Sequence, residues 1–233
     1  MERTYKARGY VLRTHPLGDA DRILVLFTYE HGKVNAVAKG ARRARSSLGG
    51  RLEFGSELTL GLHRGRSLDV VTSADLRRSD WSGIVRPEAF ATAQLFAELV
   101  DLFCEPELAL PDVYGLLDGA IRAAAGDREP GRLVPRFELR LLGALGIAPA
   151  ADRCVRCGAT LSDAAAWADL DAGGLACERC RPHRAEAFAL ASADAENFRA
   201  LAAPPRGERS ARYATTAAAK AIDGFVTYHL GKR

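Results

Sequence analysis

Long apolar runs are missing from this sequence of 233 residues. None of its hydrophobic stretches approaches the roughly 20 residues that a membrane-spanning helix needs. The first residues, Met1 to Lys6, also lack the apolar core of a signal peptide. These absences predict a soluble, cytoplasmic protein without a membrane partner, and the hydrophobic content of 48% is that of a folded globular chain.

The signature motifs of several enzyme classes are absent as well. The sequence contains no G-x-x-x-x-G-K-[ST] phosphate loop, no H-E-x-x-H motif and no G-x-S-x-G elbow. It also has no tight group of carboxylates such as two-metal nucleases use. Asp19 and Asp21 precede a predicted strand, where they suit a turn, a cap or an ion pair with Arg22. We therefore expect a protein that is not an enzyme.

Cysteine is scarce, and its odd number of five does not suit a framework of disulfides. Four of the cysteines form two C-x-x-C pairs separated by 19 residues, namely Cys154, Cys157, Cys177 and Cys180. This spacing predicts a structural zinc site, in which four thiolates fill a tetrahedral shell and leave no position for a catalytic water. His183 remains an alternative ligand in place of one cysteine.

Acidic residues are absent between Lys39 and Arg51, where five cations gather among small residues. Residues 1–80 carry a net charge of +6, residues 81–150 carry −4 and residues 151–233 carry +2. An arginine-rich loop between two strands can lie along a phosphate backbone and donate guanidinium, hydroxyl and amide hydrogen bonds. The pattern favours nucleic-acid binding, with a solvated charged loop as the alternative. The predicted contacts are Lys39, Arg42, Arg43, Arg45 and Arg51.

Other residues of the N-terminal third can enlarge this basic surface. The further cations are Arg3, Lys6, Arg8, Arg13, Arg22, Arg64, Arg66, Arg77 and Arg78. The rings available for base stacking are Tyr5, Tyr10, Phe27, Tyr29 and Phe54, although strand alternation places some of them in a core.

Apolar and polar residues alternate with a period of two through residues 5–76, which predicts short strands. One hairpin covers 22–38 with its turn at 30–33, and a second covers 58–72 with its turn at 64–66. A further strand at 5–13 brings the number to five. Five strands in so short a segment predict a small closed barrel such as an OB-fold, which leaves no exposed sheet edge.

From Pro87 onward the apolar residues follow a helical period. Helices are expected over 90–103, 113–121, 137–145 and 213–230, with a short one capped by Ser192 and a break at 204–207. Cys104 is expected to be a buried, inert thiol. The predicted fold class is α+β. An OB-fold β-barrel domain over 1–80 is followed by an α-helical domain over 81–233, with a four-cysteine zinc-ribbon insertion at 150–184.

Four short motifs lie in the first 80 residues. They are GYVLRT at 9–14, GDADRIL at 18–24, EHGKV at 30–34 and AKGARR at 38–43. Together they resemble the opening of RecO, a family of bacterial recombination mediators. Beyond residue 80 the resemblance rests on the helical body and the two C-x-x-C pairs. The resemblance implies an OB-fold followed by a helical domain with a zinc-binding insertion.

The same resemblance implies a function in DNA repair at the nucleoid. RecO-like proteins are expected to bind single- and double-stranded DNA, to anneal complementary strands and, with RecR, to assist RecA loading onto DNA coated by single-stranded-DNA-binding protein. The acidic, phenylalanine-terminated tail of that coating protein needs an apolar pocket flanked by cations. Arg122, Arg132, Arg136 and Arg140 are available, unless they pair with acids such as Glu129 and Glu138.

Two other functions remain open from the residues alone. A zinc-ribbon protein that binds RNA or acts in transcription would use the same basic barrel and ribbon, and would prefer RNA where it reads the 2′-hydroxyl. A zinc hydrolase would need an open metal position, which a four-cysteine site lacks.

Overall fold

The computed structural model describes residues 3–79, 86–161, 164–183, 188–203 and 211–231. The chain divides into two compact units, Met1–Gly131 and Arg132–Arg233. We call the first the barrel unit and the second the ribbon unit. The expected change from barrel to helical domain, at residues 80 and 81, and the expected break at 204–207 both lie outside the described residues.

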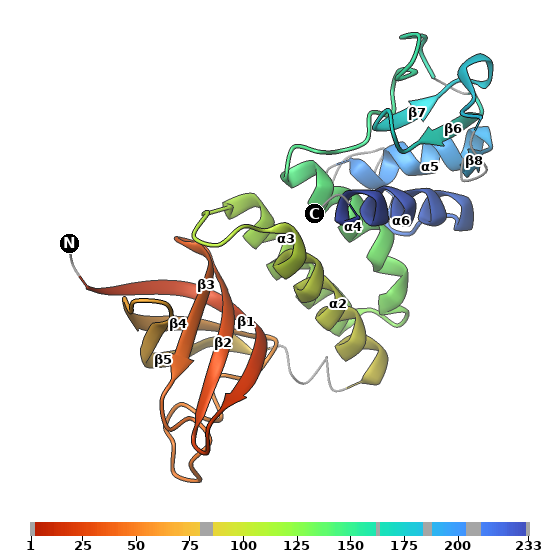
Figure 1. Ribbon diagram of the computed structural model, residues 1–233. Coiled ribbons are helices and arrows are strands. Elements are labelled where there is room, and N and C mark those ends of the chain that lie inside the picture. Colours follow the sequence, from red (N-terminus) through yellow and green to blue (C-terminus); the bar gives the residue numbers. More distant parts are fainter. Residues whose placement is uncertain (1–2, 80–85, 162–163, 184–187, 204–210, 232–233) are drawn as a thin grey trace. The chain divides into compact units, whose positions relative to one another are not determined.

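The barrel unit begins with five strands that form a closed barrel (Figure 1). They are β1 (Thr4–Leu17), β2 (Asp21–Thr28), β3 (Gly32–Ala38), β4 (Ser56–His63) and β5 (Asp69–Ser79). The strand order is β1-β2-β3-β5-β4, and β4 pairs with β1 to close the ring. All neighbours are antiparallel except β3 and β5, which pair in parallel through Ala36 and Val37. The predicted N-terminal OB-fold barrel is confirmed.

Alternation of side chains fills the barrel with aliphatic residues. Leu24 and Leu26 of β2 are fully buried, as are Leu58, Leu60 and Leu62 of β4. Each such side chain contributes roughly 1.5 to 3 kcal/mol when it leaves water, so this interior is the main source of the barrel's stability.

Two helices pack within the barrel unit, α2 (Pro87–Phe103) and α3 (Pro111–Gly126). Tyr114 of α3 is 3% exposed, and its ring lies 5.7 Å from that of Tyr10 and 6.3 Å from that of Phe27. The backbone between α2 and α3 passes so close to Gly32 that a Cβ there would lie 1.8 Å from the carbonyl oxygen of Leu108. Cys104, next to α2, is buried as predicted.

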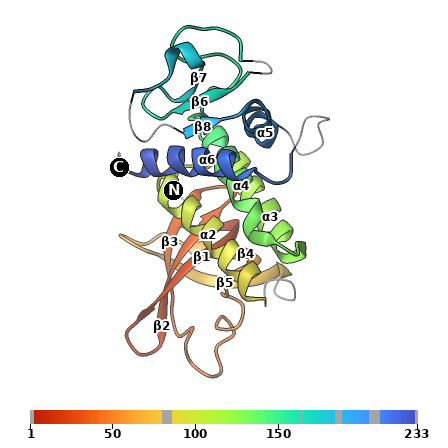
Figure 2. The same cartoon turned by 90° about the vertical axis from the view of Figure 1, so that its right-hand side faces the viewer.

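The ribbon unit combines three helices with a small sheet. The helices are α4 (Val134–Ala144), α5 (Ser192–Ala202) and α6 (Thr216–Leu230), and the 3-10 turn η1 (Pro130–Leu133) precedes α4. Figure 2 shows β6 (Ala166–Asp169) between β7 (Gly174–Ala176) and β8 (Phe188–Leu190). The turn η2 (Glu178–Cys180) follows β7. The rings of Phe198 and Phe225 meet edge to face and join α5 to α6.

The predicted helices are present, and α2, α3 and α4 begin at Pro87, Pro111 and Val134, before the first residues of their apolar patterns. Two further starts differ from the expectation. The last helix begins at Thr216 and not at Tyr213, because the Thr215 hydroxyl caps it by accepting from the Ala218 amide at 3.3 Å. Ser192 is the first helical residue of α5, so the cap position belongs to Ala191. No helix in the described part of the chain is long and apolar enough to cross a membrane.

Candidate nucleic-acid interface and metal centre

The segment between β3 and β4 carries the predicted cations, and we call residues 39–51 the basic loop. Apolar residues in the loop and directly after it hold it against the barrel, since Ala41 and the following Leu52 are buried in the barrel core and Leu48 packs on the same cluster. Lys39, Arg42, Arg43, Arg45 and Arg51 are all exposed. Anchors that point inward and cations that point outward give the loop a defined basic face.

Hydrogen bonds fix the start of the basic loop to the turn between β1 and β2. The Asp21 carboxylate accepts from the Gly40 amide at 2.7 Å, and the Arg42 amide donates to the Ala20 carbonyl at 2.8 Å. The Arg42 guanidinium donates to the Gly18 carbonyl at 2.9 Å. Asp21 thus serves the turn, one of the roles that its position suggested, whereas Arg22 pairs with Glu53 at 3.0 Å.

The five cations of the basic loop differ in whether their side chains form hydrogen bonds or ion pairs with other residues. Arg42 is held by Gly18, and Arg51 donates to the Ala74 carbonyl at 2.9 Å and pairs with Asp75 at 3.4 Å. Among the described residues, the side chains of Lys39, Arg43 and Arg45 have no hydrogen-bond or ion-pair partner. These three are the most available for a phosphate backbone.

Several of the further cations predicted to enlarge the basic surface are paired within the barrel unit. Glu57 of β4, 7% exposed, lies 3.1 Å from Arg78, 3.7 Å from Arg8 and 3.9 Å from Arg77, and accepts from the Tyr114 hydroxyl at 3.1 Å. The composition and the alternation of apolar residues did not indicate that Glu57 binds these cations, because a single acid in a strand resembles any residue that faces solvent.

Two further carboxylates join the helices to the barrel. Asp101 of α2 pairs with Arg13 at 2.6 Å and with Lys33 at 3.3 Å. Asp118 of α3 pairs with Arg78 and accepts from the Tyr10 hydroxyl at 2.6 Å. Burial acts to raise the pKa of Asp118, but the hydrogen bonds from Tyr10 and Arg78 outweigh it and hold the pKa below its usual value.

The aromatic residues of the barrel divide between core and surface. Tyr10 and Phe27 are buried beneath α3, so they are not available for base stacking. Tyr29 is 39% exposed, but the guanidinium of Arg8 lies over its ring at 4.5 Å. Tyr5 and Phe54 are partly exposed.

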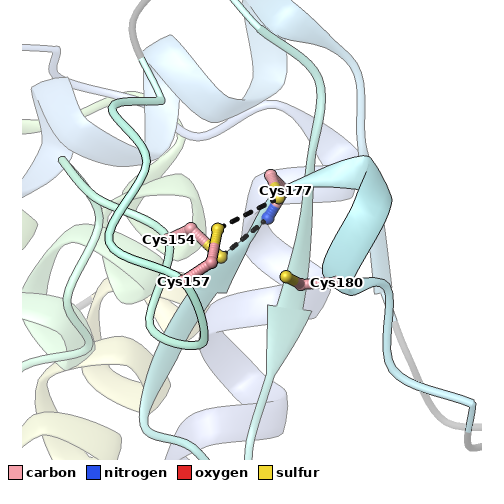
Figure 3. A group of neighbouring side chains, drawn as sticks. All are labelled: Cys154, Cys157, Cys177 and Cys180. Carbon is pink, nitrogen blue, oxygen red and sulfur yellow. Dashed lines mark hydrogen bonds between the residues drawn. The ribbon is translucent and has the colours of Figure 1, made fainter.

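The four cysteines of the two C-x-x-C pairs come together in the ribbon unit (Figure 3). Their sulfur atoms all lie within 4.8 Å of one another, and those of Cys157 and Cys177 are 3.7 Å apart. A tetrahedral shell with metal–sulfur bonds of about 2.3 Å separates its sulfurs by about 3.8 Å. The cysteines form no disulfide. The donor set and its spacing therefore fit a tetrahedral metal ion.

Ionisation of the cluster is uneven. Burial opposes ionisation of Cys154, yet hydrogen bonds from the backbone, first that of Cys177, lower its pKa to about 6. Hydrogen bonding to Cys157 and burial raise the pKa of Cys180. Cys154 and Cys180 thus differ in how readily they ionise, and a cation at the centre would stabilise all four ligands as thiolates. His183, the alternative ligand, does not belong to the group of side chains close enough to share a metal.

The arginines considered for an acidic tail fall in different units. Arg122 belongs to the barrel unit and pairs with Asp118 at 2.7 Å. In the ribbon unit Arg132 lies 4.3 Å over the Tyr213 ring, and Arg136 donates to the Ala203 carbonyl at 3.4 Å. Burial lowers the pKa of Arg136, and the charges of Arg140 and Arg212 lower it further. Cations therefore crowd together beside α4.

A family match covers nearly the whole chain, including the barrel, the basic loop and the cysteine cluster. The profile described as "Recombination protein O N terminal" matches residues 1–79, and "Recombination protein O C terminal" matches residues 86–233. The chain belongs to the RecO family. Membership supports a role in DNA repair and recombination.

Curated relatives agree with this assignment. A protein of Frankia casuarinae named "DNA repair protein RecO" is 37% identical over 97% of this chain and 93% of its own length. A protein of the same name from a Nocardioides species is 37% identical over 76% of this chain and 74% of its own length. The similarity thus includes the basic loop as well as the ribbon unit.

Proposed function

We propose that this chain is a recombination mediator that binds single- and double-stranded DNA and anneals complementary strands. The observation that carries the proposal is the basic loop, whose exposed cations stand on a closed barrel in a chain of the RecO family. Cations that neutralise phosphate charge allow two strands to approach each other. Such a protein needs no nucleotide hydrolysis and no catalytic residue.

The proposed DNA contacts are those of the basic loop, with Lys39, Arg43 and Arg45 first because their side chains have no hydrogen-bond or ion-pair partner among the residues that the structure describes. Arg42 and Arg51 contribute from fixed positions. Contacts of this kind read the phosphate backbone and not the bases, so binding should be nearly independent of sequence and strongly dependent on salt.

We further propose that the metal is zinc and that its role is structural. Cys154, Cys157, Cys177 and Cys180 would hold it. When bound, the ion links the loop before β6 to the turn after β7 and supplies folding energy to the ribbon. Since four thiolates complete its shell, the ion would offer no site for a substrate.

The partners proposed from the family are RecR, RecA and the single-stranded-DNA-binding protein, and work on the chromosome would place the chain in the cytoplasm at the nucleoid. The cations beside α4 can receive the acidic tail of the coating protein, because crowding with Arg140 and Arg212 already disfavours the charge of Arg136. A fluorescent tail peptide tests this location. Equal affinity of the peptide for the wild type and for an Arg136→Ala, Arg140→Ala variant would exclude it.

Annealing tests the main proposal. Complementary oligonucleotides should anneal faster with the protein, without ATP, both bare and coated by single-stranded-DNA-binding protein. The Arg43→Gln, Arg45→Gln variant should lower the slope of log K against log salt by about 1.4 for single strands, since each phosphate contact accounts for about 0.7. The Arg128→Gln, Lys220→Gln variant removes two exposed cations elsewhere and should keep the wild-type slope. Failure of the wild type to bind or anneal DNA would refute the proposal, and a preference for RNA of equal length would favour an RNA-binding function.

A further inference from the structure

A hollow lies beside the cysteine cluster, and the functions described so far do not use it. Its volume is about 500 Å³, and we call it the ribbon pocket. Residues of β6, of η2 and of α6 line it, so it belongs entirely to the ribbon unit. The polar side chains in its lining that matter here are those of Arg156, Asp169, Asp171, Arg179, Arg181 and Tyr228.

The arginines of the ribbon pocket are positioned by different contacts. Nε of Arg156 donates to the Asp169 carboxylate at 2.7 Å, and that carboxylate is 3% exposed while the arginine side chain is 51% exposed. The guanidinium of Arg181 lies 4.4 Å over the ring of Trp167. An arginine held along one edge or one face loses little freedom when its donors meet a phosphate.

The acids of the ribbon pocket already serve the fold. Asp169 accepts from Arg156 and from the Ala172 amide at 3.1 Å, and Asp171 accepts from the Tyr228 hydroxyl at 2.9 Å. Among the described residues, no carboxylate forms an ion pair with Arg179 or Arg181. Within the described part of the chain, the pocket therefore keeps two cations without a neutralising carboxylate.

A metal bound by four thiolates carries a net negative charge, which nearby arginines can offset. That role alone does not account for Trp167. Its indole N–H donates to Glu178 at 2.7 Å, so the ring is held in place, partly exposed, under Arg181. Arginine beside an aromatic ring is the combination with which proteins hold single-stranded nucleic acids.

We propose that the ribbon pocket binds the phosphodiester backbone of single-stranded DNA, as a contact separate from the basic loop. The inference rests on the proposed DNA-binding function and adds a second site to it. Arg179 and Arg181 meet phosphate oxygens, and Trp167 lies beside the strand. A chain with two phosphate-binding sites can hold two segments of DNA, which is what annealing requires.

Fluorescence of Trp167 tests the pocket in the full-length, zinc-loaded protein. The sequence has two tryptophans, so Trp81→Phe leaves Trp167 as the single reporter. Titration with a single-stranded deoxythymidine oligonucleotide should change its emission. In the chain that keeps both tryptophans, Arg179→Gln should weaken DNA binding about five-fold at 0.1 M salt. It should also lower the slope of log K against log salt by about 0.7, the value for one lost phosphate contact. Arg153→Gln is the matched control, because Arg153 is exposed on the same ribbon outside the pocket.

The outcomes separate this inference from the proposed function. If the wild type does not bind DNA, both are wrong. If DNA binds, but the emission of Trp167 does not change and Arg179→Gln binds DNA as tightly as the wild type does, only the inference about the ribbon pocket is wrong. Faster loss of zinc to a chelator in Arg179→Gln, with DNA affinity unchanged, would show that the arginines only offset the metal site. A response of Trp167 to polyglutamate and not to DNA would assign the pocket to an acidic protein partner and overturn the proposal.

Discussion

Replacing Glu138 by glutamine should stabilise the ribbon unit at neutral pH. Glu138 of α4 is 6% exposed, and burial followed by the charge of Asp223 raises its pKa from 4.5 to about 7. In the described part of the chain no cation pairs with it. The folded state therefore holds a proton that the unfolded state has already released between about pH 4.5 and 7.

The sign of the pH dependence follows from proton linkage. Below pH 4.5 Glu138 is protonated in both states and has no effect on stability. As the pH rises toward 7 the unfolded state ionises first, so the free energy of unfolding falls, and above about pH 7 it levels off. A rise of the pKa from 4.5 to about 7 corresponds to about 3 kcal/mol.

Chemical denaturation followed by Trp167 fluorescence, in the Trp81→Phe background, measures this effect in the ribbon unit. At pH 7.5 Glu138→Gln should raise the free energy of unfolding by up to about 3 kcal/mol, and the gain should shrink as the pH falls toward 5. Zinc content is checked at each pH, and Glu196→Gln, an exposed change on α5, serves as the control. A gain that does not vary with pH, or a loss of stability at pH 7.5, would refute the reasoning.

Three other changes test the metal site, a turn and a cap. Cys157→Ser should abolish binding of about one zinc per chain and loosen the ribbon, and with it the contacts of the ribbon pocket, while DNA binding by the basic loop is retained, as elemental analysis and a binding titration would show. Gly32→Ala should destabilise the barrel unit by more than about 1 kcal/mol in thermal unfolding, since the new Cβ meets the Leu108 carbonyl and φ is +65°. Thr215→Ala should cost about 1 kcal/mol in denaturant unfolding, because α6 loses its cap.

The barrel and the long helices were predictable because their patterns run over many residues. In β4, Leu58, Leu60 and Leu62 alternate with Thr59, Gly61 and His63, and α3 repeats its apolar residues at helical spacing. Strands β7 and β8 were not predicted, since three residues are too few for a period to show. The parallel pairing of β3 with β5 was also missed, because it joins segments about 30 residues apart and leaves no local signal.

The candidate site shows the same limit. Two C-x-x-C pairs have few other uses, so their spacing predicted a cluster that the fold does bring together. A run of arginines, by contrast, does not reveal which side chains the fold employs, and Arg42 and Arg51 bond to carbonyls that only the tertiary structure supplies. Nor did the sequence indicate that Tyr114, about 100 residues from Tyr10, would cover the barrel aromatics.

The pairing of Glu57, Asp101 and Asp118 with barrel cations has a kinetic consequence. These acids neutralise arginines where the helices meet the barrel, whereas in the basic loop Lys39, Arg43 and Arg45 have no ion-pair partner among the described residues. The barrel unit is therefore electrically polarised, and in the proposed binding of DNA its field would turn an approaching strand toward the basic loop before contact. Association with DNA should accelerate at low ionic strength, and Glu57→Gln should weaken this orientation, because it leaves the cations around Glu57 without their acid.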